Sequence, residues 1–197
     1  NGETIGAAHA DQHVLVYETA DASVSVAAGA QPYMVTFNTP SWVQGSTNNN
    51  NIKYDYYTTT VNGAPFTGSM RLVKQGEGVL TLPAGEHTYT GETNIWNGTF
   101  NFDGKLTNSA LWLNRHTTLN TNGGQFKSIK MDYASKLNIG ETSVPCSATV
   151  GTLALGFGSR VILDIYNDGL KADQLNATSL SIETKNWNYG PDYLMPV

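Results

Sequence analysis

The sequence predicts an all-β protein, and three observations favour a β-solenoid whose short coils stack along one axis. First, short segments that alternate apolar and polar residues recur through most of the chain, as in strands with one buried face. Second, glycine-containing turns separate these segments. Third, helix signals are nearly absent, because the one segment with faint helical character, residues 165–176, carries Gly169 in its middle.

Residues 1–68 predict a less regular region of strands that leads into the solenoid. The Asn-rich segment 38–51 contains Pro40 and Gly45, which favour turns, so we expect a loop there. Residues 62–68 predict the next turn. Valine, aromatic and β-branched residues predict strands at 13–17, 23–27, 32–38 and 52–61.

Residues 69–183 predict the regular part of the solenoid. Apolar pairs such as Phe100 with Phe102, Leu111 with Leu113, and Leu180 with Ile182 are spaced to face one side of their strands. Strands are expected at 70–74, 79–82, 94–96, 99–102, 110–113, 117–120, 125–133, 136–139, 152–155, 160–165 and 179–182.

Two architectures accommodate such short alternating strands. Stacked coils would line a common interior with identical faces, and glycines would occupy the corners. Stacking would also allow amide ladders at the turns, for which the candidates are Asn94, Asn97, Asn101, Asn108, Asn114 and Asn120. An antiparallel β-sandwich or jelly roll is the alternative, since it also uses short alternating strands.

The stretch "LVKQGEGVLTLPAGEHTYTGETNIWNGTFNFDG", residues 72–104, resembles the autotransporter-associated β-strand repeat. The matching positions are Lys74, Gly76, Gly78, Leu80, Leu82, Tyr89, Thr90, Gly91, Thr93, Ile95, Gly98, Thr99, Phe102 and Gly104. Residues 153–182 are similar to the segment that follows such repeats in passenger regions. The resemblance implies a right-handed parallel β-helix, commonly an extended passenger or stalk, and supplies no catalytic residues. Since the chain has one clear copy, we expect an accessory module of a larger surface protein.

Composition limits the classes of function. The net charge of −5 and the scattered basic residues argue against nucleic acid as a partner. Charged residues make up only 14% of the chain, so Thr, Ser, Asn and Gln must keep the surface soluble. The single Cys146 forms no internal disulfide and is expected to have no catalytic role. The chain contains no apolar stretch long enough to span a bilayer as a helix, and its start at Asn1 predicts a processed protein or a piece of a larger one.

No residue is predicted to be catalytic or to bind a cofactor or metal. The candidate carboxylates for glycan cleavage are Asp132, Asp164, Asp168 and Asp173, and a structural role is expected for them. Asp173 in particular is expected to accept backbone N–H bonds at a turn. His87 and His116 lack an evident third metal ligand and are expected to be polar surface residues.

Aromatic residues are the candidates for ligand contact, because exposed rings stack on sugar rings. The candidates for contact with glycans are Trp42, Tyr54, Tyr56, Trp96, Trp112, Trp187 and Tyr189. The alternative is that these rings cover the open ends of the solenoid core. Residues 184–197 predict a C-terminal cap or a linker.

The resulting hypothesis is a non-catalytic structural, stalk or accessory module of a secreted or surface protein, in the outer membrane of a Gram-negative bacterium. Its expected partners are other domains of the same polypeptide and glycans bound weakly, in an adhesive or carbohydrate-binding role. No insertion of this segment into the membrane and no cofactor are expected. The alternative is a part of a polysaccharide lyase or glycoside hydrolase of the β-helix type.

Overall fold

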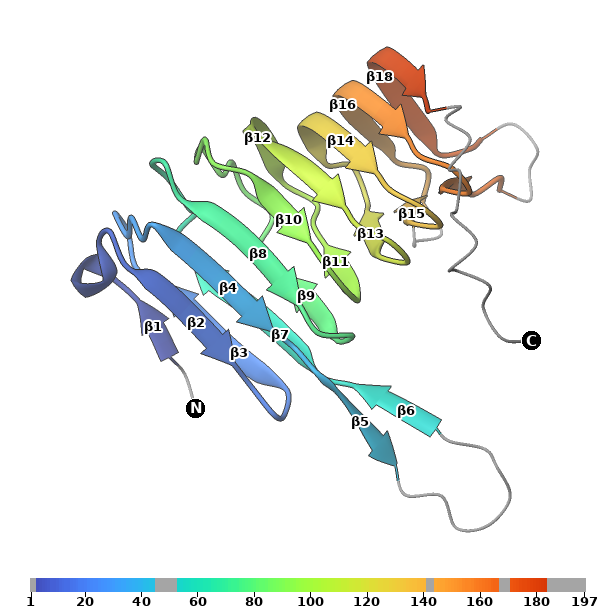
Figure 1. Cartoon of the computed structure of the whole chain (residues 1–197). Helices are drawn as coiled ribbons and strands as arrows, with labels where there is room; N and C mark the ends of the chain where they lie inside the picture. The colour runs from blue at the N-terminus through green and yellow to red at the C-terminus, as the bar shows by residue number, and fades with distance from the viewer. Residues whose placement is uncertain (1–2, 45–52, 141–143, 167–170, 184–197) are drawn as a thin grey trace, which may run out of the picture.

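The computed structural model describes residues 3–44, 53–140, 144–166 and 171–183, and these form a parallel β-helix whose coils stack along one axis (Figure 1). All neighbouring strands in its two large sheets are parallel. The predicted all-β solenoid is therefore confirmed, and the antiparallel sandwich is wrong. Of the described residues, only η1 (Ala7–His9) forms a helical turn.

Each coil contributes a strand to each of two walls, which we call sheet 1 and sheet 2. Sheet 1 has the order β1 (Glu3–Ile5), β3 (Ala22–Val26), β7 (Thr58–Gly63), β9 (Val79–Thr81), β11 (Thr99–Asn101), β13 (Thr118–Thr121), β15 (Lys136–Ile139) and β17 (Arg160–Leu163). Sheet 2 has the order β2 (His13–Tyr17), β4 (Met34–Asn38), β8 (Arg71–Gln75), β10 (Thr93–Ile95), β12 (Lys105–Leu113), β14 (Gln125–Met131), β16 (Ser147–Leu155) and β18 (Gln174–Ile182).

The core is a column of apolar side chains that the two walls enclose. Register pairing places Leu113 between Ile95 and Met131 in sheet 2, and all three are at most 1% exposed. In sheet 1, Leu119 lies between Phe100 and Leu137, all of them fully buried. Each such side chain stabilises the fold by roughly 1.5–3 kcal/mol through removal of apolar surface from water. The coils are held together without any disulfide, since Cys146 is a free thiol.

The N-terminal strands differ from the sequence prediction in two places. Residues 38–51 were expected to be a loop, but β5 (Ser41–Gln44) pairs with β6 (Lys53–Tyr56) in an antiparallel hairpin. The strand expected at 52–61 is divided at Tyr57, because β6 belongs to this hairpin while β7 belongs to sheet 1. Figure 1 shows the hairpin projecting from the coils. It is inserted in the chain between β4 and β7, which accounts for the less regular N-terminal region.

The two ends of the core differ in exposure. In the first coil, the inward residues Ile5 and Val16 are each only 2% exposed. In the last coil, apolar residues expected to face inward are exposed, at 42% for Leu163, 57% for Leu180 and 65% for Ile182. β17 and β18 are the last strands of their sheets, so no described strand stacks on them (Figure 1). We call this face the open end. Residues 165–176 form no helix among the described positions, and β18 begins there.

A four-residue turn joins sheet 2 to sheet 1 in three successive coils. Its third residue has a positive φ angle, 59° at His116, 54° at Ala134 and 70° at Gly158. Its fourth residue donates a side-chain hydroxyl to the carbonyl of the first, at 2.7 Å for Thr117 and for Ser135, and at 2.8 Å for Ser159. The same turn is therefore built with and without glycine at its left-handed position.

These turns predict opposite effects for two reciprocal substitutions. Ala134→Gly should raise the free energy of unfolding by about 0.5–1 kcal/mol, because glycine adopts a positive φ without a Cβ clash. Gly158→Ala should lower it by about 1 kcal/mol, since the added Cβ meets only ordinary contacts, the nearest 3.7 Å away, and the cost is conformational. Urea denaturation of both variants checks this. Equal effects of the same sign would contradict it.

One amide ladder runs along the outer face of sheet 1. The Asn120 amide donates to Asn101 and the Asn138 amide donates to Asn120, both at 2.9 Å. The bonding between Asn101 and Asn120 confirms that an amide ladder forms, and Asn138 extends it, but the predicted location at the turns is wrong, because all three residues lie on strands β11, β13 and β15. The remaining candidates make other bonds: Asn94 to Glu92, Asn97 to Glu77, Asn108 to Thr88 and Asn114 to Ile95.

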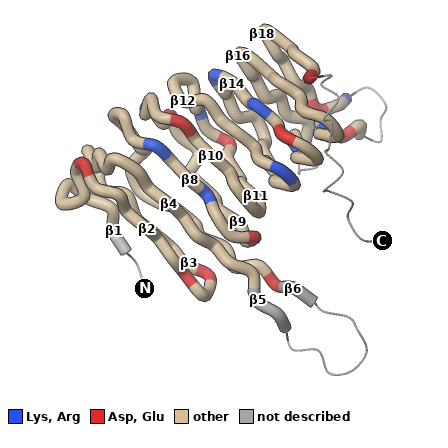
Figure 2. Tube along the Cα trace, in the orientation of Figure 1, with Lys and Arg blue, Asp and Glu red and all other residues tan. Residues whose placement is uncertain are grey.

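Charged side chains are sparse on this surface. Figure 2 shows Lys, Arg, Asp and Glu as isolated positions among long stretches without charge. A close ion pair joins Arg71, at the start of β8, to Glu92, the residue before β10, at 2.9 Å. Within the described ranges, no helix is both long enough and apolar enough to cross a membrane.

Candidate functional site

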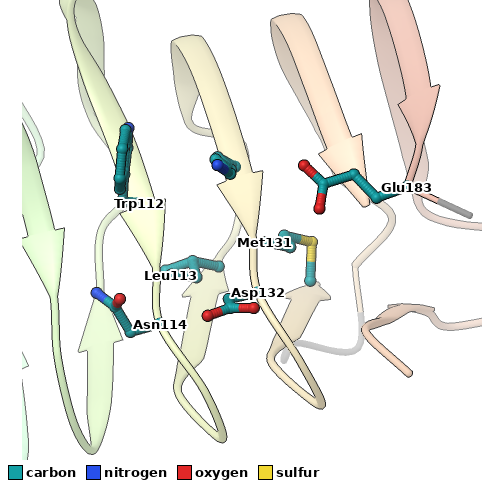
Figure 3. Close-up of a pocket in the computed structure, with 7 residues that line it drawn as sticks. Trp112, Leu113, Asn114, Met131, Asp132 and Glu183 are labelled. Carbon is teal, nitrogen blue, oxygen red and sulfur yellow. The ribbon is translucent and has the colours of Figure 1, made fainter. Parts of the chain in front are cut away.

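A hollow of about 150 Å³ lies on the outer face of sheet 2, where its later strands end (Figure 3). Its lining comes from three coils: Trp112, Leu113 and Asn114 from the end of β12, Lys130, Met131 and Asp132 from the end of β14, and Glu183 after β18. We call it the β12–β14 hollow.

Strand register brings the two long outward side chains of the hollow together. Trp112 pairs with Lys130 across β12 and β14, and alternation turns both away from the buried Leu113 and Met131. The Lys130 ammonium lies 4.8 Å from the centre of the Trp112 ring. This is a cation–π contact, and the ring remains 40% exposed.

Two carboxylates lie at the edge of the hollow. Asp132 accepts a hydrogen bond from its neighbour's backbone, Tyr133 N–H, at 2.7 Å, and its other oxygen lies 3.9 Å from Arg115 Nε. The Glu183 N–H donates to Leu155 at 2.8 Å, which holds its backbone to the preceding coil. Figure 3 shows the Glu183 carboxylate extending from the last coil toward the neighbouring ones. The hollow thus combines an aromatic ring, an ammonium, an amide and two carboxylates.

The structure brings together only some of the predicted aromatic residues. Trp96 directly follows β10, whose Asn94 pairs with Trp112, so both tryptophans lie on the outer face of sheet 2. Trp96 is 53% exposed. Tyr56 is 54% exposed but belongs to the projecting hairpin. The other candidates have side chains outside the described residues (Trp42, Tyr54) or lie wholly outside them, with the predicted cap or linker 184–197 (Trp187, Tyr189).

Among the described carboxylate candidates, Asp164 and Asp173 are hydrogen-bonded neighbours, whereas Asp132 lies at the β12–β14 hollow. Asp173 is only 4% exposed and accepts hydrogen bonds from Cys146 N–H at 2.9 Å and Asp164 N–H at 3.1 Å. The Tyr166 hydroxyl donates to it at 3.0 Å. Burial alone would raise the pKa of Asp173, but these hydrogen bonds bring it below its ordinary value. The structural role expected for Asp173 is confirmed, while Asp168 lies outside the described residues.

His87 contradicts its predicted surface position, whereas His116 is exposed as expected. The His87 ring is fully buried, with ring centres 5.4 Å from Phe102 and 5.9 Å from Phe66. Phe66 N–H donates to Nδ1 at 3.1 Å, so Nε2 carries the proton and donates to the Pro83 carbonyl at 3.3 Å. Its aromatic neighbours and these two bonds explain its burial. In the described part of the chain, no three His, Cys, Asp or Glu side chains cluster to hold a metal.

His87 predicts a loss of stability in weak acid. Burial lowers the pKa of His87 below its ordinary value of about 6.5, so the folded state favours the neutral ring. The stability from the neutral ring is present above about pH 6.5 and is lost as the pH falls toward the folded pKa. Urea midpoints between pH 7 and pH 5 should fall more steeply for the wild type than for His87→Gln. If the urea midpoints of the two proteins fall equally with pH, the buried neutral His87 ring is not the cause of the loss of stability.

Lys74 is a further buried polar residue that sequence reasoning did not single out, except as a position of the repeat. It is fully buried, and its ammonium donates to the carbonyls of Gln75 at 2.9 Å, Gly76 at 2.6 Å and Asn97 at 3.1 Å. The signal was its alternation with Leu72, which places both side chains on the inward face of β8. Lys74 ties together the turns of two successive coils.

Comparison with known families places this lysine in a recognised repeat. Residues 72–101, from β8 to β11, match the family model of the passenger-associated-transport-repeat. No curated protein and no solved structure matches the chain. The matched repeat and the parallel β-helix are consistent with an autotransporter passenger repeat protein, which confirms the resemblance of this segment. The repeat family implies a secreted or surface location.

Proposed function

We propose that the chain is a non-catalytic structural module in the passenger of a larger autotransporter-type protein, displayed at the outer membrane of a Gram-negative bacterium. The observation that carries this proposal is the stack of parallel coils around one continuous apolar core. Such a stack holds apart the domains attached at its two ends, because each coil adds a further layer of about 4.8 Å along the axis. The matched repeat supports the passenger context.

Surface labelling tests this location. An antibody raised against the recombinant chain should label intact cells of the source bacterium. A control antibody against a cytoplasmic protein should label them only after permeabilisation. If the module's antibody also requires permeabilisation, the proposed display is wrong.

The open end supports a second part of the proposal, that another domain of the same polypeptide packs there. It exposes Leu163, Leu180 and Ile182. It also presents the outer edge of β18, a nine-residue strand without a charged side chain, although edge strands usually carry charges that oppose pairing. A photo-crosslinking residue in place of Leu180, within the complete native polypeptide, should form a crosslink to another domain of that polypeptide, outside this chain. A crosslink only to a different protein would contradict this.

We also propose that exposed tryptophans of sheet 2 contact glycans weakly, in an adhesive role. Trp96 and Trp112 are the described candidates that lie on one face, and half-exposed rings offer the apolar surface on which sugars stack. Quenching of tryptophan fluorescence by millimolar oligosaccharides would support the contact. The absence of quenching across a broad panel would exclude it.

The enzymatic alternative, a polysaccharide lyase or glycoside hydrolase, is favoured only by the presence of both Asp132 and Glu183 at one hollow. Paired carboxylates supply the acid and base in glycosidases. Incubation of the chain with acidic and neutral polysaccharides should yield no new reducing or unsaturated ends. Turnover that is lost in Asp132→Asn would establish the alternative and overturn the non-catalytic assignment.

A further inference from the structure

We propose that the β12–β14 hollow binds one uncharged pyranose unit of a glycan, with Trp112 as the stacking platform. This inference rests on the glycan contact proposed above and adds the site and the class of sugar. It is carried by the geometry of the hollow and by the mixture of hydrogen-bonding groups around it.

The hollow exists because β16 contributes almost no side chain to this part of the outer face. In register, Lys130 lies beside Ala154. The position after Met131 holds Asp132, and the corresponding position after Leu155 holds Gly156. The methyl group of Ala154 on β16 and Gly156, directly after β16, therefore occupy the positions between β14 and Glu183. Among the residues that the structure describes, no large side chain separates Lys130 and Asp132 from Glu183.

Trp112 supplies the apolar contact. The C–H groups on one face of a pyranose carry a small positive charge, so they pack on an aromatic ring in the same manner as a cation. The Lys130 ammonium already occupies a position 4.8 Å from the centre of this ring. Because the Lys130 side chain is exposed, a sugar ring can displace the ammonium and then accept a hydrogen bond from it.

The polar groups favour a sugar without charge. Hydroxyls donate and accept hydrogen bonds, so they satisfy both the acceptors Asp132 and Glu183 and the donors Lys130 and Asn114. A uronic acid would bring its carboxylate close to two others. An amino sugar would bring its ammonium close to Lys130 and to Arg115, which lies 3.9 Å from Asp132. Either charge would meet repulsion from one pair of side chains and attraction from the other, so it would gain little in the hollow while losing part of its hydration, whereas hydroxyls satisfy both pairs.

Size and neighbours indicate a single primary unit in a longer glycan. A volume of about 150 Å³ is smaller than typical small-molecule pockets of roughly 300–1,000 Å³. Trp96 belongs to the coil that precedes Trp112, and its position corresponds to that of Asn114 in the next coil. A glycan that runs along the solenoid axis from the hollow would reach Trp96 with its next unit.

Titrations with uncharged trisaccharides of glucose, galactose and mannose test the proposal. At least one of them should quench tryptophan fluorescence at millimolar concentration and shift the indole N–H resonance of Trp112. The matched trisaccharides of glucuronic acid and glucosamine, which add one charge per ring, should bind at least about tenfold more weakly.

Four variants locate the site with the same sugars in calorimetric titrations, which do not depend on the Trp112 signal, and melting curves confirm that each is folded. Trp112→Ala should abolish binding, and Ala154→Leu should do the same by filling the gap on β16 while every contact group remains. Trp96→Ala should weaken binding only about twofold to fivefold. Tyr56→Ala, on the hairpin, is the matched aromatic control and should bind as the wild type does.

Each outcome distinguishes the two proposals. If a charged trisaccharide binds as tightly as its neutral counterpart, or if Trp112→Ala and Ala154→Leu both retain wild-type binding, this inference is overturned while glycan contact stands. If no trisaccharide binds at millimolar concentration, both the hollow's role and the glycan contact are wrong. The structural role of the module is unaffected in either case.

Discussion

Replacing Leu113 with Asp is expected to unfold the β-helix at room temperature. Leu113 is 1% exposed and packs in the column between Ile95 and Met131. The substitution removes an apolar side chain, at a cost of about 2–5 kcal/mol, and places a carboxylate where water cannot reach it. The combined cost approaches the whole stability of a typical domain, roughly 5–15 kcal/mol.

Circular dichroism and thermal melting measure this effect directly. Thr107→Asp is the matched control, because Thr107 lies on the same strand with an exposed side chain and gains the same charge. It should change the melting temperature little. A Leu113→Asp variant with the melting temperature of the wild type would show that this apolar column does not hold the coils together.

Replacing Lys74 with Met should destabilise the fold by about 2–4 kcal/mol. The ammonium donates to three backbone carbonyls of two successive coils, and those carbonyls cannot be removed along with it. Met has a similar length without donors, so the carbonyls would lose their partner inside the fold. Lys136→Met is the matched control, since Lys136 is an exposed lysine on β15 and should be nearly neutral.

The pH dependence of this difference has a defined sign. Burial lowers the pKa of Lys74 to about 7, while the unfolded chain keeps a value near 10.5. Between these values the unfolded state binds more protons, so the stability of the wild type rises with pH. The difference between wild type and Lys74→Met in urea should therefore be larger at pH 9 than at pH 6. A difference that shrinks with pH would contradict the assignment.

Much of the fold could be predicted because its signals are local. Alternation along a strand gives the inward face of Leu111 and Leu113 without knowledge of any neighbour. The kind of role that Asp173 plays could also be predicted, since a short carboxylate at a turn accepts backbone N–H bonds, but its donors Cys146 and Asp164 lie 27 and 9 residues away and are supplied by the fold. The hairpin was missed because its first strand, Ser41–Gln44, has only four residues between Pro40 and an Asn-rich stretch.

The burial of His87 and Lys74 could not be predicted from the polarity of their side chains. His87 and Lys74 look like surface residues in the sequence. Each is buried because a partner from another coil or turn satisfies it, Phe66 N–H for the ring and the Asn97 carbonyl for the ammonium. Those partners lie 21 and 23 residues away in sequence, so only the stacking of the coils brings them within bonding distance.

The sequence by itself determined the class of fold, since alternating strands, glycine turns and one recognisable repeat are properties of short segments. The tertiary structure alone decided which residues meet across coils. Coil length varies, because Val35 pairs with Leu72 across the inserted hairpin whereas Thr93 pairs with Leu111. The β12–β14 hollow depends on the register of the later strands of sheet 2, from β12 to β18. Trp112, Lys130 and Glu183 come from three coils and lie together only because the strands between them pair as they do.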